Sequence, residues 1–267
     1  MEHPLEDCRL KVARAKEQFN ALHDEIVRFS EDNPYVVDVQ VDPETGDEIF
    51  ESAEPPRFPR RWATLVGEIA HNLRSSLDQL VAVFIREAGR EPDGNNAFPI
   101  SKTKDRYLVR NKRGLSYRDR LLRQVPNHIK QRIDALQPYQ RGNLAYADAL
   151  IALRHMSDRD KHREPQTAYA WITTPTKAFS FPTDDEMRNL KIRLPRKGGV
   201  DVQADFKRGR GKPAAIVVYP DVKVQREPGV EVVFGRDPDK LVGLDDLRGM
   251  IGYVETIIES FAADFKP

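Results

Sequence analysis

Histidine, arginine and carboxylate side chains recur on one face of a predicted helix and offer acid–base chemistry. Within residues 60–87, His71, Arg74 and Asp78 are three and four residues apart, so they share a narrow arc of the helix. A second polar set lies at the end of another predicted helix and comprises Arg154, His155, Asp158 and residues 160–163. If the two sets converge, an imidazole beside cations can act as a general acid or base toward a phosphodiester. The candidate catalytic residues are His71, Arg74, Asp78, Asp160, Lys161 and His162.

Two simpler interpretations compete with this chemistry. Arg74 and Asp78 are four residues apart, so on a solvated face they form an ion pair that contributes only about 0.3–0.5 kcal/mol. Alternatively, the face is a polar seam beneath a second element, which Gly67 and Ala82 favour because small residues let another backbone approach. The charged run at 158–163 is also typical of a solvated helix end, where cations meet the helix dipole favourably.

No metal or cofactor is expected from the residue pattern. A metal site would have to use His71, His155, His162 and nearby aspartates, which lack the i, i+4 histidine pair of a zincin helix. Cys8 is the only cysteine and falls on a helix seam, so thiolate ligands are missing. No phosphate-binding glycine loop and no nucleophile elbow is found.

Charge is distributed unevenly along the chain. Residues 101–132 contain eleven basic and two acidic residues, a net charge of +9, whereas residues 24–54 contain eleven acidic residues and one arginine, a net of −10. The basic segment either neutralises the acidic one, within the chain or across a dimer, or binds nucleic acid. Three tyrosines in or near it, Tyr107, Tyr117 and Tyr139, are candidates for stacking on bases. The candidate nucleic-acid-binding residues are Arg110, Lys112, Arg113, Arg208, Arg210 and Lys212.

Helical periodicity accounts for the first part of the chain. Apolar residues step by three and four from Leu5 to Phe29 and again from Trp62 to Phe84, which predicts two long helices. We expect them to pack antiparallel within the chain; a coiled-coil homodimer is the competing use of the first seam. Between them, residues 35–41 and 48–51 alternate around a turn and predict a β-hairpin. A short helix after Pro126 and a third long helix over 144–157 follow.

The rest of the sequence predicts strands and one closing helix. Six short segments between residues 168 and 234 read as strands, and apolar positions from Leu244 to Phe265 predict an amphipathic helix. The predicted fold class is α+β: an antiparallel helical bundle with an inserted β-hairpin, then an antiparallel β region and a C-terminal helix. The expected domains are a helical bundle at 1–164 with the hairpin at 34–56, a β region at 165–243, and a helix at 244–267 that packs back on the bundle.

Composition places the chain among soluble proteins. It has 267 residues, 39% of them hydrophobic and 32% charged, with a formal net charge of +1. The longest apolar run is far shorter than the roughly 20 residues of a membrane-spanning helix. With one cysteine and a polar, acidic beginning unlike a signal peptide, we expect a cytoplasmic protein without membrane contact. Homo-oligomerisation and nucleic-acid binding are the expected forms of partnership.

Three segments together resemble a family of uncharacterised bacterial proteins. They are HNLRSSLDQL at 71–80, FPI at 98–100 and DKHR at 160–163. Members of that family carry a similar HNLRSALDxL helix, an FPI segment and a DKHR segment before a β region. The resemblance covers residues 60–173 and implies a bacterial or phage origin, but it implies no activity.

A second similarity is to HEPN-type helical ribonucleases, which place an Arg-x4–6-His motif at a helix pairing. Here seven residues separate Arg154 from His162 and two separate Arg159 from His162, so the spacing departs from that motif. The residues leave open whether the chain is an enzyme. The leading hypothesis is a non-catalytic binding module whose charged surfaces engage a protein or nucleic-acid partner, and the alternative is a metal-independent nuclease.

Overall fold

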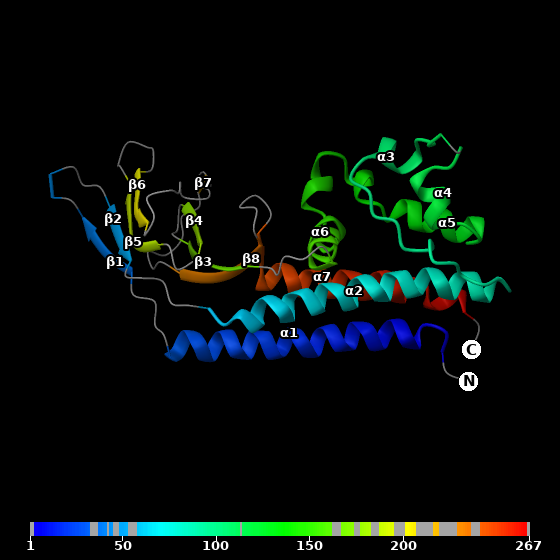
Figure 1. Ribbon diagram of the computed structural model, residues 1–267, viewed down its shortest axis with the longest axis horizontal. Coiled ribbons are helices and arrows are strands. Elements are labelled where there is room, and N and C mark those ends of the chain that lie inside the picture. The colour runs from blue at the N-terminus through cyan, green and yellow to red at the C-terminus, as the bar shows by residue number, and fades with distance from the viewer. Residues whose placement is uncertain are drawn as a thin grey trace. The chain divides into compact units, whose positions relative to one another are not determined.

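The computed structural model of the chain is drawn in Figure 1. Residues 159–161 and most strand residues are described by their backbone alone. Five of the predicted site residues lie outside the described residues: Arg113, His162, Arg208, Arg210 and Lys212. The described residues are 3–32, 37–41, 43–44, 48–52, 58–112, 114–161, 167–173, 177–182, 187–194, 201–206, 216–218, 229–235 and 241–265.

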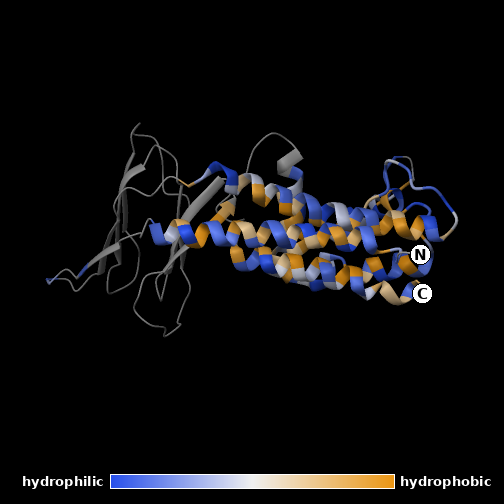
Figure 2. Cartoon of the chain, turned by 90° about the horizontal axis from the view of Figure 1, so that it is seen from below, coloured by the Kyte–Doolittle hydropathy of each residue, from blue (hydrophilic) through white to orange (hydrophobic). Residues whose placement is uncertain are grey.

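The two longest helices, α1 (Glu6–Asp32) and α2 (Arg60–Glu87), lie side by side and run antiparallel (Figure 1). The Asn72 amide donates a hydrogen bond to Gln18 Oε1 at 2.8 Å. The predicted apolar seam of α1 is buried, since its members from Leu5 to Ile26 are each at most 6% exposed. This confirms intramolecular packing of the seam. Apolar residues recur in regular bands along both helices (Figure 2).

A glycine ends α2. Gly89 adopts φ +70°, a conformation that residues with a Cβ rarely adopt. Its N–H donates to the Arg86 carbonyl at 2.8 Å, and the Arg90 N–H donates to the Ile85 carbonyl at 3.1 Å. These two bonds form a Schellman motif, which satisfies carbonyls that the helix end would otherwise leave unpaired.

The closing helix α7 (Leu244–Ser260) packs against α1 and α2. The Arg9 and Lys16 side chains of α1 form ion pairs with Glu259 and Glu255 of α7, at 2.7 and 2.6 Å. Just beyond α7, the rings of Phe261 and Phe265 contact the Phe84 ring of α2, with centroids 5.0 and 5.8 Å apart. The described part of the C-terminal segment therefore returns to the helical layer.

Three short helices carry the basic segment: α3 (Lys104–Leu108), α4 (Tyr117–Leu121) and α5 (Asn127–Ala135). One carboxylate joins all three. Asp134 of α5 accepts a hydrogen bond from the Tyr107 hydroxyl at 2.7 Å and bonds from Arg118 Nε and Nη2 at 2.8 and 2.7 Å. Tyr107 is fully buried, and this carboxylate therefore joins the three short helices through buried and half-buried contacts.

The third long helix begins later than the sequence pattern predicts. Residues 144–147 belong to a 3₁₀ segment, η1 (Pro138–Ala147), and α6 spans Ala149–Lys161. Leu144 is 65% exposed and lies outside α6, so the predicted helix start at residue 144 is wrong. Asp148 starts α6 instead: its Oδ1 accepts the Leu150 N–H at 2.8 Å, the hydrogen bond of an N-cap. The capping aspartate overrides the apolar periodicity that favoured Leu144.

The strands pair antiparallel in two sheets. One has the order β1-β2-β5-β6 and the other β7-β4-β3-β8-β9. The hairpin is formed by β1 (Val37–Val41) and β2 (Glu48–Ser52), and β2 also pairs with β5 (Met187–Leu194). The chain is thus α+β. The remaining strands are β3 (Thr167–Thr173), β4 (Lys177–Pro182), β6 (Asp201–Phe206), β7 (Ile216–Val218), β8 (Gly229–Gly235) and β9 (Val242–Gly243).

The chain divides into two compact units. The helical unit comprises residues 1–21, 65–165 and 245–267, and the β unit comprises residues 22–64 and 166–244. Within the β unit, the Trp62 ring lies 5.1 and 5.4 Å from the rings of Phe29 and Phe58. The domain limits expected from the sequence stay a prediction. None of the helices in the described ranges combines the length and apolarity needed to cross a membrane.

Candidate functional site

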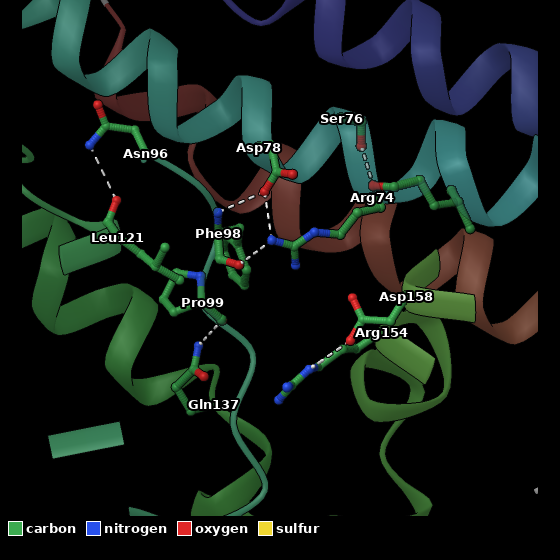
Figure 3. A network of polar contacts seen from close by, with 11 residues as sticks. Arg74, Ser76, Asp78, Asn96, Phe98, Pro99, Leu121, Gln137, Arg154 and Asp158 are labelled. Atoms are coloured by element: carbon green, nitrogen blue, oxygen red, sulfur yellow. Dashed lines mark hydrogen bonds and ion pairs between the residues drawn. The ribbon is translucent and has the colours of Figure 1, made fainter. Parts of the chain in front are cut away.

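The polar face of α2 holds the backbone of the FPI segment, residues 98–100 (Figure 3). Arg74 Nη2 donates hydrogen bonds to Asp78 Oδ1 and to the Phe98 carbonyl, both at 2.7 Å. The same Asp78 oxygen accepts the Phe98 N–H at 2.8 Å. The Arg74 side chain is only 14% exposed and that of Asp78 31% exposed. Around Arg74 and Asp78 this face therefore lies against a second element, as the polar-seam interpretation predicts, whereas His71 on the same face is exposed.

Side chains from two further segments complete the hold on the FPI segment. Gln137 donates from Nε2 to the Pro99 carbonyl at 2.8 Å and accepts the Ser101 N–H at 3.1 Å. Arg154 of α6 donates from Nη1 to the Ile100 carbonyl at 3.0 Å. An irregular buried segment must have its backbone groups satisfied, and here side chains do so. We call this set of contacts, made by Arg74, Asp78, Gln137 and Arg154, the FPI clamp.

A cavity of about 310 Å³ opens on the same face of α2. Its lining includes His71, which is exposed, and Gln79, whose buried Oε1 has no hydrogen-bond partner among the described residues. The cavity offers an imidazole, a guanidinium and a carboxylate on one surface. However, Arg74 and Asp78 use the atoms named above to hold Phe98. The residues of α2 that line it are His71, Arg74, Ser75, Asp78, Gln79 and Ala82.

The second polar set reaches this neighbourhood through α6. Arg154 and Asp158 lie near Arg74 in Figure 3, and Arg154 Nε lies 3.4 Å from Asp158 Oδ2. Asp160 and Lys161 are the last two residues of α6. At 1.5 Å per residue they stand roughly 10 Å along the axis from Arg154. The structure thus brings the beginning of the second set to the first, while a catalytic role for the six candidates stays a prediction.

Several cations of the basic segment form ion pairs with carboxylates of the helical unit. Arg118 pairs with Asp134 at 2.7 Å, and Arg123 pairs with Asp93 at 2.5 Å. Arg132 pairs with Asp264, just beyond α7. These carboxylates belong to the helical unit. Local pairing therefore accounts for part of the +9 charge.

A second cavity, which we call the basic pocket, is lined by three of the cations that have no such partner among the described residues. Its volume is about 560 Å³, within the range of about 300–1,000 Å³ typical of ligand pockets. Within the described residues, Arg106, Lys112 and Arg120 form no ion pair. Six residues define its chemistry: Arg106, Val109, Lys112, Leu115, Tyr117 and Arg120.

One tyrosine is the centre of the basic pocket. The guanidinium carbons of Arg106 and Arg120 lie 6.0 and 5.7 Å from the centroid of the Tyr117 ring, at the outer range of a cation–π contact. The acidic residue nearest to Tyr117 in sequence is Asp119, which lies 3.5 Å from Arg118. Hydrogen bonding with the Ser116 hydroxyl holds the pKa of Asp119 below its usual value, so this carboxylate stays ionised. Arg106 and Arg120 thus lie on either side of Asp119 in sequence and close to the ring of Tyr117 in the structure.

The other two tyrosines have structural contacts. The Tyr107 side chain is buried and bonded to Asp134, which removes it as a stacking surface for a base. Burial raises the pKa of Tyr107, and the hydrogen bond to Asp134 raises it further. The Tyr139 ring packs beside it, with centroids 5.3 Å apart. Only Tyr117 among the three predicted stacking residues lines the basic pocket.

The sequence pattern missed some of the residues at both places. Gln137 was not among the predicted site residues, because a glutamine beside a proline carries no periodic signal. Arg106 and Arg120 belonged to the charged segment but were not distinguished from its paired members. Of the predicted nucleic-acid-binding residues that the structure describes, Lys112 lines the basic pocket, whereas Arg110 is exposed outside its lining.

No group of three or more metal-binding side chains is found in the part of the chain that the structure describes. Comparisons with known protein families, with curated proteins and with solved structures found no match to this chain. The suggested family and the similarity to HEPN ribonucleases therefore stay hypotheses, and function is argued from the residues alone.

Proposed function

We propose that this chain is a binding module that engages nucleic acid through the basic pocket. The observation that supports the proposal most strongly is the contrast within one segment. Arg118, Arg123 and Arg132 have carboxylate partners, whereas Arg106, Lys112 and Arg120 gather around a cavity without one among the described residues. All three side chains are exposed, so their charges are accessible to a ligand.

Electrostatics favours a polyanionic ligand at this position. Like charges held close together repel one another, and a ligand that carries several phosphates relieves that repulsion. Cations that neutralise phosphates also release condensed counterions, which supplies much of the affinity of nucleic-acid-binding proteins. An aromatic ring among the cations adds a surface on which a base can stack. Nucleic acid has all three features that the pocket suits: several phosphates, condensed counterions and bases that can stack.

The nuclease alternative uses the other cavity. His71 is exposed and lines the same cavity as Arg74, and Arg154 and Asp158 of α6 lie near Arg74 (Figure 3). A general acid or base and a cation are therefore on one surface, as phosphodiester cleavage requires. Against it, the Arg74 guanidinium already donates to Asp78 and to Phe98. We keep this alternative as a separate outcome of the same experiment.

The proposal is tested by fluorescence anisotropy with an end-labelled single-stranded RNA at several salt concentrations. The test variant is the double substitution Arg106→Gln/Arg120→Gln. The matched control is Arg60→Gln/Arg86→Gln, which removes two exposed arginines at the ends of α2. We expect the wild type and control to bind with a steep salt dependence. The test variant should bind more weakly, with a slope of log K against log salt smaller by about 0.7 for each lost phosphate contact.

The same reactions run on a denaturing gel report cleavage. Intact RNA in bound samples agrees with a binding module, whereas cleavage that is lost in His71→Ala or His162→Ala would support the nuclease alternative. Absence of binding at low salt, at about 50 mM, would reject the proposed function. Equal weakening by the test and control variants would reject the basic pocket as its site.

A further inference from the structure

The basic pocket joins its cations to exposed apolar side chains. Val109 is 65% exposed and Leu115 is 40% exposed, and both line the cavity with the ring of Tyr117. Phosphate binding needs no apolar surface, so cations alone do not account for this composition. The pocket has one set of groups suited to phosphates and another suited to a flat, weakly polar ring.

Backbone hydrogen bonds hold the loop that presents these apolar side chains. The Asn111 N–H donates to the Leu115 carbonyl at 2.9 Å, and the Gly114 N–H donates to the Asn111 carbonyl at 2.9 Å. The Leu115 N–H donates back to Asn111 Oδ1 at 3.3 Å. Gly114 has φ +74°, which suits a residue without a side chain. The pocket is therefore formed before a ligand arrives, which limits the entropy that binding must cost.

We infer that the basic pocket binds an unpaired nucleotide, and so prefers single-stranded nucleic acid to a duplex; this rests on the proposed function. A duplex turns its phosphates outward and keeps its bases stacked inside, so it meets the cations but leaves Val109 and Leu115 in water. A single strand can place a base against Tyr117, Val109 and Leu115. Arg106, Lys112 and Arg120 then bind the phosphates on either side of that base.

The experiment compares one labelled strand, alone and annealed to its complement, at the same salt concentration. Val109→Ser/Leu115→Ser is the test variant. Leu144→Ser is the control, because Leu144 is as exposed as Val109 but lies outside the pocket. We expect the wild type to bind the single strand about tenfold more tightly than the duplex, in line with base stacking on a protein surface. Circular dichroism checks that each variant is folded.

The test variant should lose most of the preference. Its affinity for the single strand should fall by about tenfold, with its salt slope unchanged and duplex binding little affected. Equal binding of strand and duplex by the wild type would overturn this inference while leaving the proposed function in place. Equal competition by inorganic polyphosphate, matched in charge, would overturn it too, because polyphosphate has no bases. Absence of binding to either nucleic acid would reject the proposed function itself.

Discussion

Arg74 of α2 donates a 2.7 Å hydrogen bond to the carbonyl of Phe98, twenty-four residues later in the chain. Asp78 accepts the N–H of the same residue, so both backbone groups of Phe98 are satisfied by side chains one helical turn apart. The Phe98 side chain is fully buried. The sequence shows the HNLRSSLDQL helix and the FPI segment only as two separate motifs. In the structure, side chains of the first motif bind the backbone of the second.

Removing the Arg74 guanidinium should destabilise the helical unit. Arg74→Ala removes the donor that the Phe98 carbonyl and the Asp78 carboxylate share, while Asp78 keeps its bond from the Phe98 N–H. Hydrogen bonds to charged groups are worth about 1.5–3 kcal/mol, so we expect the free energy of unfolding to fall by about 2–3 kcal/mol. Urea denaturation followed by circular dichroism measures it.

The matched control for this prediction is Arg86→Ala, an exposed arginine near the end of α2. Substitutions at such surface positions change stability by about 0.5 kcal/mol or less. If Arg74→Ala lowered the free energy of unfolding no more than the control does, the FPI clamp would contribute little to stability. The Arg74 side chain would then be available for chemistry, as the nuclease alternative requires.

The Tyr107 hydroxyl should contribute to the stability of the basic segment. Tyr107→Phe removes one hydrogen bond to Asp134, which keeps its bonds from Arg118, so we expect a loss of about 1 kcal/mol. Asp134→Ala should cost more, because it removes the hydrogen bonds from Arg118 as well and leaves the buried Tyr107 hydroxyl without its acceptor. Thermal unfolding of both variants orders the two effects. A larger loss in Tyr107→Phe than in Asp134→Ala would contradict the central place of this carboxylate.

Asp148 should make stability depend on pH. Its side chain is fully buried, with Oδ2 lying 2.9 Å from Arg141 Nη1. Burial raises the pKa of Asp148 above its usual value of 3.8, although the Leu150 N–H and the charge of Arg141 lower it. A carboxyl whose pKa is raised by folding stabilises the fold below its usual pKa. It loses that contribution as the pH rises through the raised value.

Asp148→Asn keeps an oxygen that can cap α6 but removes the charge. We expect this variant to lose the fall in stability that begins near pH 4 and continues upward, and to be at least as stable as the wild type at neutral pH. Urea midpoints at a series of pH values measure both effects. Asp245→Asn, at a side chain 91% exposed, is the control. A variant markedly less stable than the wild type at neutral pH would show that the charged pair with Arg141 outweighs burial.

The sequence predicts the elements of the helical unit better than their polar contacts. The limits of α2 follow from its apolar stripe, from Pro59 and from Gly89, which are local signals. The predicted start of α6 at residue 144 was wrong, because the N-cap Asp148 outweighs the apolar pattern of residues 144–147. The pairing of β2 with β5 was not predicted, because the alternation of one strand does not name its neighbour.

The candidate sites could be predicted only in part. Spacing along one helix placed His71, Arg74 and Asp78 on a common face, and the structure shows all three on one cavity. The contact of Arg74 with Phe98 forms because the chain turns back after α2, and helical periodicity does not predict such a turn. In the same way, the sequence shows that residues 101–132 are basic, but not which cations lack a partner. Only the folded positions of Asp93, Asp134 and Asp264 reveal that.

Photocrosslinking tests the proposed site of nucleic-acid binding most directly. A single-stranded RNA containing 4-thiouridine is crosslinked to the full chain, and the attached peptides are mapped by mass spectrometry. We predict crosslinks within residues 106–120, centred on Tyr117, and their loss in Arg106→Gln/Arg120→Gln but not in Arg60→Gln/Arg86→Gln. Crosslinks confined to other residues, or unchanged in the test variant, would contradict the assignment of nucleic-acid binding to the basic pocket.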